Sequence, residues 1–158
     1  MNRIASHVAL SAAIVSMLAL PTVAAERTAL KPATRAAAPA AVLVADAELK
    51  WTDVPEFPGV KMARLHGDPN MGPSHFFLKL PSGFAAGMHF HNADHWVAVV
   101  SGTLVLTPEG GAEKKLPAGS GFGFTGKKKH TTKCAEGSDC VLFIDARGKW
   151  DVIPTDKK

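Results

Sequence analysis

The sequence contains no tyrosine, and this absence excludes reaction mechanisms that depend on a tyrosine acid or a tyrosyl radical. It also contains no glycine-rich phosphate-binding loop, no dinucleotide-binding fingerprint and no serine nucleophile elbow. Nucleotide-dependent enzymes and serine hydrolases of the common kinds are therefore excluded. The chemistry of this chain has to be sought in its other polar residues.

The chain beyond its first 25 residues has no sustained 3.6-residue hydrophobic period, so we expect little α-helix there. Short alternating or apolar segments are separated instead by turns rich in Gly, Pro, Asn and Asp. The expected strands cover residues 60–65, 74–80, 88–91, 95–100, 103–107, 113–116, 121–124, 129–134 and 140–146, with an edge strand at 150–153. This spacing predicts an all-β sandwich or barrel.

The first 25 residues have the composition of a secretory signal peptide. Arg3 is followed by an apolar run at residues 8–20 and by the small residues of a cleavage site, which we place after Ala25 with Ala24 as the alternative. An uncleaved anchor is the competing interpretation, but the run is short for a membrane span. We therefore expect a periplasmic or secreted protein that is not attached to a membrane after cleavage.

The rest of the chain divides into a linker, one domain and a short tail. Residues 26–48 are rich in Ala and Pro, which is typical of a linker. Residues 49–153 contain all the expected strands, and a segment of roughly 100 residues suffices for one domain with one core. Residues 154–158 form a tail.

The net charge is small, at +4. No basic stripe is interleaved with aromatic residues and no helix is expected that could enter a groove, so we expect no nucleic-acid partner. The one run of like charge is Lys127–Lys129. We interpret it either as a solvated loop or as a feature that attracts an anionic ligand toward the histidine site described below.

Cys134 and Cys140 are the only cysteines of the chain. An exported protein can form a disulfide, and the residues between these cysteines, with Gly137 at their centre, are typical of a hairpin turn. In a symmetric hairpin the two cysteines face each other across the ladder, so we predict a disulfide there. Two free thiols are the main alternative, and a metal-binding role for Cys134, four residues after His130, is a weaker one.

Four of the seven histidines follow a pattern that suits one metal ion. His89 and His91 are two residues apart, so on a strand their side chains share a face, and His95 keeps that parity if the strand resumes after a short turn. His130 follows a second glycine-rich stretch that begins at Gly119. Neutral imidazole is the commonest metal ligand in proteins, so we predict a metal site formed by His89, His91, His95 and His130.

The stretch around the first three of these histidines resembles the first conserved motif of the cupin superfamily. It runs from Gly83 through His89 and His91 to Gly102, and these two histidines and two glycines keep the intervals of that motif. The motif has a glutamate where this chain has His95. Because several positions keep the register together, the resemblance is specific, and it covers about residues 50 to 153.

The stretch that leads to the fourth histidine resembles the second cupin motif less closely. Gly119 and His130 match its glycine and its histidine, whereas Thr125, Lys127 and Cys134 replace its proline, its second glycine and its asparagine. The resemblance implies a double-stranded β-helix, or jelly roll, with a metal near its open end. It also implies that the three histidines that match the two motifs are metal ligands.

His95 changes the charge of the implied site. Three histidines and a glutamate carry one negative charge, whereas four imidazoles carry none, so a bound divalent ion would keep its full charge and favour anionic substrates or coligands. Nitrogen ligands suit Fe, Zn, Cu or Ni better than Mg, Ca or Mn. We expect His95 either to complete the metal site or to act as a catalytic base beside a three-histidine site, which some cupin dioxygenases use.

Three functions stay open from the sequence. The first, and our main expectation, is a mononuclear non-haem metal oxygenase that acts on a small organic molecule. The second is a cupin module that binds a metal or a small ligand without turnover. The third is a metal-free, isomerase-type cupin in which a histidine is the general base. In each case the expected partner is a small molecule, and a homodimer is an option that the sequence leaves open.

Overall fold

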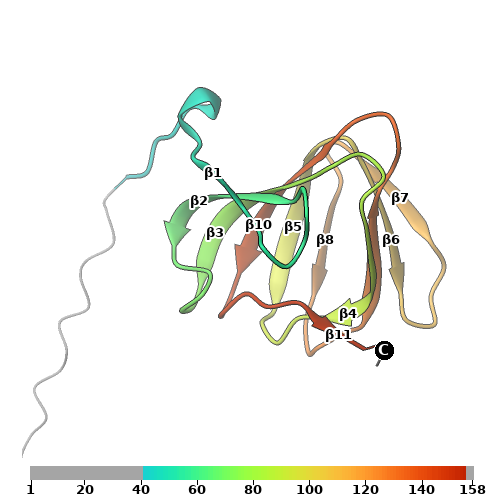
Figure 1. Ribbon diagram of the computed structural model, residues 1–158. Coiled ribbons are helices and arrows are strands. Elements are labelled where there is room, and N and C mark those ends of the chain that lie inside the picture. Colours follow the sequence, from blue (N-terminus) through green and yellow to red (C-terminus); the bar gives the residue numbers. More distant parts are fainter. Residues whose placement is uncertain (1–40, 156–158) are drawn as a thin grey trace, which may run out of the picture. The chain divides into compact units, whose positions relative to one another are not determined.

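The computed structural model describes residues 41–155, and nearly all of its regular structure in this range is β-strand (Figure 1). A single 3-10 turn, η1 (Asp46–Glu48), precedes the strands. The strands are β1 (Trp51–Asp53), β2 (Lys61–Gly67), β3 (Ser74–Leu80), β4 (Ala85–Phe90), β5 (His95–Ser101), β6 (Thr103–Pro108), β7 (Lys114–Pro117), β8 (Gly121–Phe124), β9 (His130–Cys134), β10 (Cys140–Ala146) and β11 (Ile153–Pro154). Within the described range, no helix has the length and hydropathy needed to cross a membrane.

The strands form two antiparallel sheets. Sheet A has the order β1-β2-β3-β10-β5-β8, and sheet B has the order β11-β4-β9-β6-β7. From β3 onward the chain changes sheet at each connection except the β6–β7 hairpin, so neighbouring strands come from distant parts of the sequence. This is the connectivity of a jelly roll, and it confirms the predicted all-β double-stranded β-helix.

A period of two along the strands places the core between the sheets. In β5 the side chains of His95, Val97 and Val99 are buried, whereas those of Trp96 and Val100 are exposed. Strands β3 and β10 alternate in the same way. The buried apolar cluster consists of Val60, Phe76, Leu78, Leu80, Val97, Val99, Leu104, Leu106, Leu116, Cys134, Cys140, Leu142, Ile144 and Ala146. The parity that predicts an inward-facing His95 is therefore the one observed.

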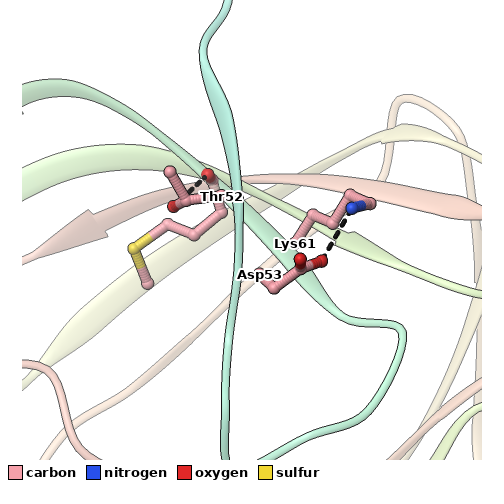
Figure 2. A network of polar contacts seen from close by, with 4 residues as sticks. Thr52, Asp53 and Lys61 are labelled. Atoms are coloured by element: carbon pink, nitrogen blue, oxygen red, sulfur yellow. Dashed lines mark hydrogen bonds and ion pairs between the residues drawn. The ribbon is translucent and has the colours of Figure 1, made fainter.

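The first strand, β1, was not expected from the sequence. It pairs with β2, and Lys61 Nζ lies 2.7 Å from a carboxylate oxygen of Asp53 (Figure 2). On the neighbouring residue, the Thr52 hydroxyl donates a hydrogen bond of 3.2 Å to the carbonyl oxygen of Met62. Three residues are too few to show an alternating pattern, and β1 is defined by these contacts to β2 rather than by its own sequence.

Regular structure begins slightly earlier and ends slightly later than the elements expected from the sequence. The 3-10 turn η1 falls inside the segment expected to be a linker, and the rest of that linker up to residue 40 lies outside the described residues, as does the expected signal peptide. At the other end, the expected edge strand at 150–153 is shorter and later, because only Ile153 and Pro154 pair with β4. Thr155 continues the contact through its backbone N–H, which donates to the carbonyl of Met88 at 2.9 Å.

Gly102 shows why the first cupin-like stretch ends in a glycine. Its φ is +76°, in the left-handed region that favours glycine, and it lies in the tight connection from β5 to β6. A Cβ at this position would lie 2.6 Å from the carbonyl oxygen of Asp139. A side chain is therefore excluded both by backbone conformation and by space.

Cys134 and Cys140 form the predicted disulfide, with 5.8 Å between their Cα atoms. The predicted hairpin is wrong, however, because Cys134 ends β9 in sheet B and Cys140 begins β10 in sheet A. Their ladder partners are Leu104 and Leu80, respectively. The turn between the cysteines carries the chain from one sheet to the other, so the disulfide joins the two sheets rather than two strands of one ladder.

Removal of this disulfide is expected to lower the free energy of unfolding by about 2 kcal/mol, because it closes only a short loop in the unfolded chain. The measurement is urea unfolding of the wild type and of a Cys134→Ala/Cys140→Ala variant, with intact-mass analysis after thiol labelling to show that the wild type is oxidised. Equal unfolding midpoints for the two proteins would contradict the expectation.

Candidate metal centre

His89, His91 and His130 come together in one buried cluster. His89 lies in β4, His91 follows the end of that strand, and His130 is the first residue of β9. β4 and β9 are antiparallel neighbours, and His89 pairs directly with His130 across them. The metal-binding atoms of the three residues all lie within 4.8 Å of one another, and each residue is at most 5% exposed.

Backbone carbonyls determine which ring nitrogen of each histidine is free. The Nδ1–carbonyl contacts are His89 with Gly87 (2.7 Å), His95 with Ala93 (3.2 Å), His130 with Lys128 (3.0 Å) and His91 with Asp151. A carbonyl oxygen can only accept a hydrogen bond, so in the neutral ring Nδ1 carries the hydrogen and Nε2 keeps a free lone pair. All four rings thus have the tautomer that binds a metal through Nε2, with the outer nitrogen held as in known metal sites.

Burial keeps these imidazoles neutral. Desolvation is the largest effect on each ring, and it lowers the pKa of His91 to about 2, with a further lowering from the nearby His95. Desolvation also lowers the pKa of His130 to about 4. The pKa values of His89 and His95 are lowered for the same reason. At neutral pH the cluster therefore presents uncharged nitrogen donors, which is the form that binds a metal.

His95 lies beside this cluster rather than within it. It is the first residue of β5 and is 2% exposed, and its ring centroid lies 4.5 Å from that of His91 and 6.2 Å from that of His130. The structure thus brings together three of the four predicted ligands. The physical reason is that β5 belongs to sheet A, whereas His89 and His130 lie on sheet B. A role for His95 as a fourth ligand or as a base stays a prediction.

The four histidines line a cavity of about 650 Å³ inside the barrel. Most of the remaining wall is apolar and comes from both sheets, and it includes Val97 and Phe122, which pair with each other between β5 and β8. Phe57 and Phe84, whose rings make an edge-on contact at 6.1 Å, also line it. A cavity of this size and composition suits a small organic molecule.

Trp150 and Asp151 belong to the site although the sequence did not point to them. The Trp150 ring stacks on His91, with 4.2 Å between centroids and 25° between planes. The Asp151 carbonyl accepts the hydrogen bond from His91 Nδ1 across 60 residues of sequence. Neither residue matches a cupin motif position, and a contact over that separation leaves no local pattern, so no signal in one sequence could have identified them.

The lysine run precedes β9 and supports the site through its backbone. Lys128 supplies the carbonyl that holds His130, and Lys129 Nζ forms an ion pair of 2.8 Å with Glu109. Attraction of an anionic ligand by this run stays a prediction. The carboxylate of Asp94, next to His95 in sequence, accepts the Gly126 N–H at 3.0 Å. The cluster identified among the described residues consists of three histidines and contains no carboxylate.

The chain belongs to a known protein family. The family described as a domain of unknown function, DUF4437, matches residues 15–157 of the chain. No curated protein matches. The matched range includes every strand and all four histidines, and the description of the family names no activity.

Solved structures show the same fold. The polyketide cyclase RemF from Streptomyces resistomycificus is 16% identical, with a TM-score of 0.62 over 73% of this chain and 86% of that chain. KdgF from Halomonas sp. is 22% identical, with a TM-score of 0.55 over 66% and 93%. An RmlC-like cupin from Ralstonia eutropha is 23% identical, with a TM-score of 0.60 over 73% and 74%. These similarities confirm the cupin fold, and one fold hosts many reactions.

Proposed function

We propose that this chain, which belongs to the DUF4437 family of domains of unknown function and has the cupin fold, is a mononuclear metalloenzyme of the oxygenase type that acts on a small organic molecule. The observation that carries the proposal is the cluster of His89, His91 and His130, whose neutral nitrogens meet at an apolar cavity. The donor chemistry fits the metal that the fold implies. A divalent Fe, Zn, Cu or Ni ion held there would supply Lewis-acid chemistry with its charge uncompensated by any carboxylate ligand.

His95 is the residue we propose to hold or move a proton. Its Nδ1 is bound by the carbonyl of Ala93, so Nε2 is the nitrogen available at the cavity wall. Its lowered pKa keeps it unprotonated at neutral pH, as a base requires. The ring lies next to that of His91, so a substrate oxygen at the cluster is also within reach of His95.

The cavity favours a substrate with an apolar body and an anionic oxygen. Apolar residues from both sheets, Val97 and Phe122 among them, line the cavity and would exclude water from the body of the substrate. An anionic oxygen is favoured at the cluster because none of its three ligand residues is negative. The Lys127–Lys129 run would attract such a molecule.

We also propose that the protein works in the periplasm or outside the cell. The predicted signal peptide supports this location, and so does the disulfide, because disulfides persist mainly in oxidising compartments.

The first experiment measures metal content after reconstitution with Fe(II), Zn(II), Cu(II), Ni(II) or Mn(II) in turn. We expect one ion per chain for at least one of the first four and weak binding of Mn(II), because the donors are nitrogen. Azide is then titrated into the Co(II)-loaded protein, and a change in its visible spectrum is expected if the metal keeps an open position.

These measurements separate the three functions considered from the sequence. Protein that takes up none of the metals supports the metal-free isomerase-type cupin. Protein that binds metal but gives no spectral response to azide has a closed site, as in a non-catalytic binding module. Oxygen uptake with catechol or 2,4-pentanedione by the Fe(II) protein, and none by the Zn(II) protein, is the result expected of an oxygenase, because Zn has no redox chemistry.

A further inference from the structure

His91 differs from the other three histidines in how its ring is held. His89, His95 and His130 each contact the carbonyl of the residue two positions earlier in their own segment. His91 instead contacts the carbonyl of Asp151, which lies 60 residues away in the segment between β10 and β11. The orientation of this ring therefore depends on a distant part of the chain.

Asp151 is itself fixed by the residue that follows His91. One oxygen of its carboxylate accepts the backbone N–H of Asn92 at 2.9 Å, and the other accepts the Asn92 side-chain amide at 2.6 Å. With the carbonyl contact to His91, the two consecutive residues His91 and Asn92 make three hydrogen bonds to Asp151. These bonds set the position of the Asp151 carbonyl relative to the ring.

Trp150 holds the face of the same ring. It stacks on His91, makes an edge contact to His95 at 5.3 Å and another to Phe76 at 5.3 Å. Its backbone N–H donates to the carbonyl of Pro69 at 2.7 Å, and this bond attaches the segment between β10 and β11 to the connection between β2 and β3. Beyond Asp151, β11 runs beside β4, the strand that leads into His91 (Figure 1).

We propose that Asn92 and Asp151 are positioning residues for His91, and that their hydrogen-bonded pair sets the tautomer and the aim of His91 Nε2 toward the metal. This inference rests on the metal site of the proposed function. A hydrogen bond from Nδ1 to a carbonyl fixes both the tautomer and the rotation of an imidazole, and loss of such an outer contact typically weakens metal affinity about 10- to 100-fold.

The test compares variants by Zn²⁺ affinity, measured in competition with a chelating dye. Asp151→Ala is expected to weaken Zn²⁺ binding about 10- to 100-fold. Asn92→Asp is expected to weaken Zn²⁺ binding as well, because it places a second carboxylate against that of Asp151. In the wild type the Asn92 amide donates to the Asp151 carboxylate at this point, at 2.6 Å. The double variant Asn92→Asp/Asp151→Asn restores an amide opposite a carboxylate, and we expect it to recover most of the lost affinity.

Asp139→Ala is the matched control. The Asp139 carboxylate accepts a backbone N–H from Ser82 at 3.0 Å across 57 residues of sequence, much as Asp151 accepts one from Asn92 across 59, but Asp139 lies in the turn that precedes β10. We expect this variant to keep the Zn²⁺ affinity of the wild type. A general effect of losing a long-range carboxylate contact would weaken binding in both alanine variants.

The tautomer of His91 supplies a readout that needs no metal. Nitrogen–proton correlation spectra of the metal-free protein should show His91 protonated at Nδ1 in the wild type, in Asp139→Ala and in the double variant, and a mixture of tautomers in Asp151→Ala and Asn92→Asp. A wild type that binds no metal would overturn the proposed function, whereas these spectra would still decide the positioning role. Unchanged spectra and affinity in Asp151→Ala, or a double variant no better than Asn92→Asp, would overturn the inference.

Discussion

Replacement of His89, His91 or His130 by alanine is expected to abolish stoichiometric metal binding. Each residue supplies one of three nitrogens in a cluster that has no carboxylate to take its place. The loss of affinity should therefore exceed the roughly 10- to 100-fold that is typical of contacts behind a ligand. His95→Ala should weaken binding less, because His95 lies outside the group of three, and His95→Glu should keep metal while adding the negative charge of the usual cupin site. Elemental analysis after reconstitution and gel filtration gives the occupancy.

His75→Ala is the control for these variants. His75 lies in β3 outside the cavity, so the same substitution there should leave metal occupancy unchanged. Circular dichroism of each variant shows whether the β-fold persists. Full occupancy in a folded His89→Ala protein would mean that the cluster is not the metal site.

Acid is expected to destabilise the metal-free protein. The unfolded chain protonates its histidines near pH 6.5, whereas burial lowers the pKa of folded His130 to about 4 and that of His91 to about 2. Because the unfolded state binds more protons than the folded state in this window, stability is fully present above pH 6.5 and falls as the pH drops toward the folded pKa. The lowered pKa of His130 alone should reduce the free energy of unfolding by about 3 kcal/mol between pH 7 and pH 4.5. This follows from a loss of about 1.4 kcal/mol for each pH unit below 6.5.

Urea unfolding at pH 7 and pH 4.5, with a chelator present, measures this effect. His130→Gln should reduce the difference in the free energy of unfolding between the two pH values, because it removes one group that titrates only in the unfolded chain. The same pKa values imply that metal binding persists to a lower pH than free histidine would allow. Equal stability at the two pH values would show that these rings can accept protons inside the fold.

The fold was predictable because alternation and turn residues are local. The buried positions of β5 follow from the sequence of that strand alone, and the turns around Gly102 and Gly137 mark real connections. The partner of each strand was not predictable from alternation. The disulfide illustrates the difference: two cysteines six residues apart indicated a bridge, but whether it lay within one ladder or between two sheets depended on the path of the whole chain.

The clustering of His89, His91 and His130 was predictable from the sequence, whereas the contacts behind these residues were not. Their intervals place them on the ends of neighbouring strands, so the spacing was enough to predict that they lie close together. The alternating pattern of β5 predicts that His95 faces the interior of the barrel. Its distance from the other histidines depends in addition on how far apart sheets A and B lie at this end of the barrel, which the pattern does not determine. Asp151 contributes through its backbone carbonyl and through Asn92, and a backbone contact depends on position in space rather than on residue type.

The cystine and the histidine cluster lie at opposite ends of the same strand, because β9 begins at His130 and ends at Cys134, a span of about 13 Å at the usual rise per residue. A chain whose cysteines are already joined offers an incoming ion only imidazole at this strand. A reduced chain also offers two thiols, which as thiolates attract Zn and Cu(I). The order of maturation therefore matters for the proposed metal site: oxidation before metal loading removes the two thiols as competing ligands, and protein produced under reducing conditions can acquire a different metal at its cysteines.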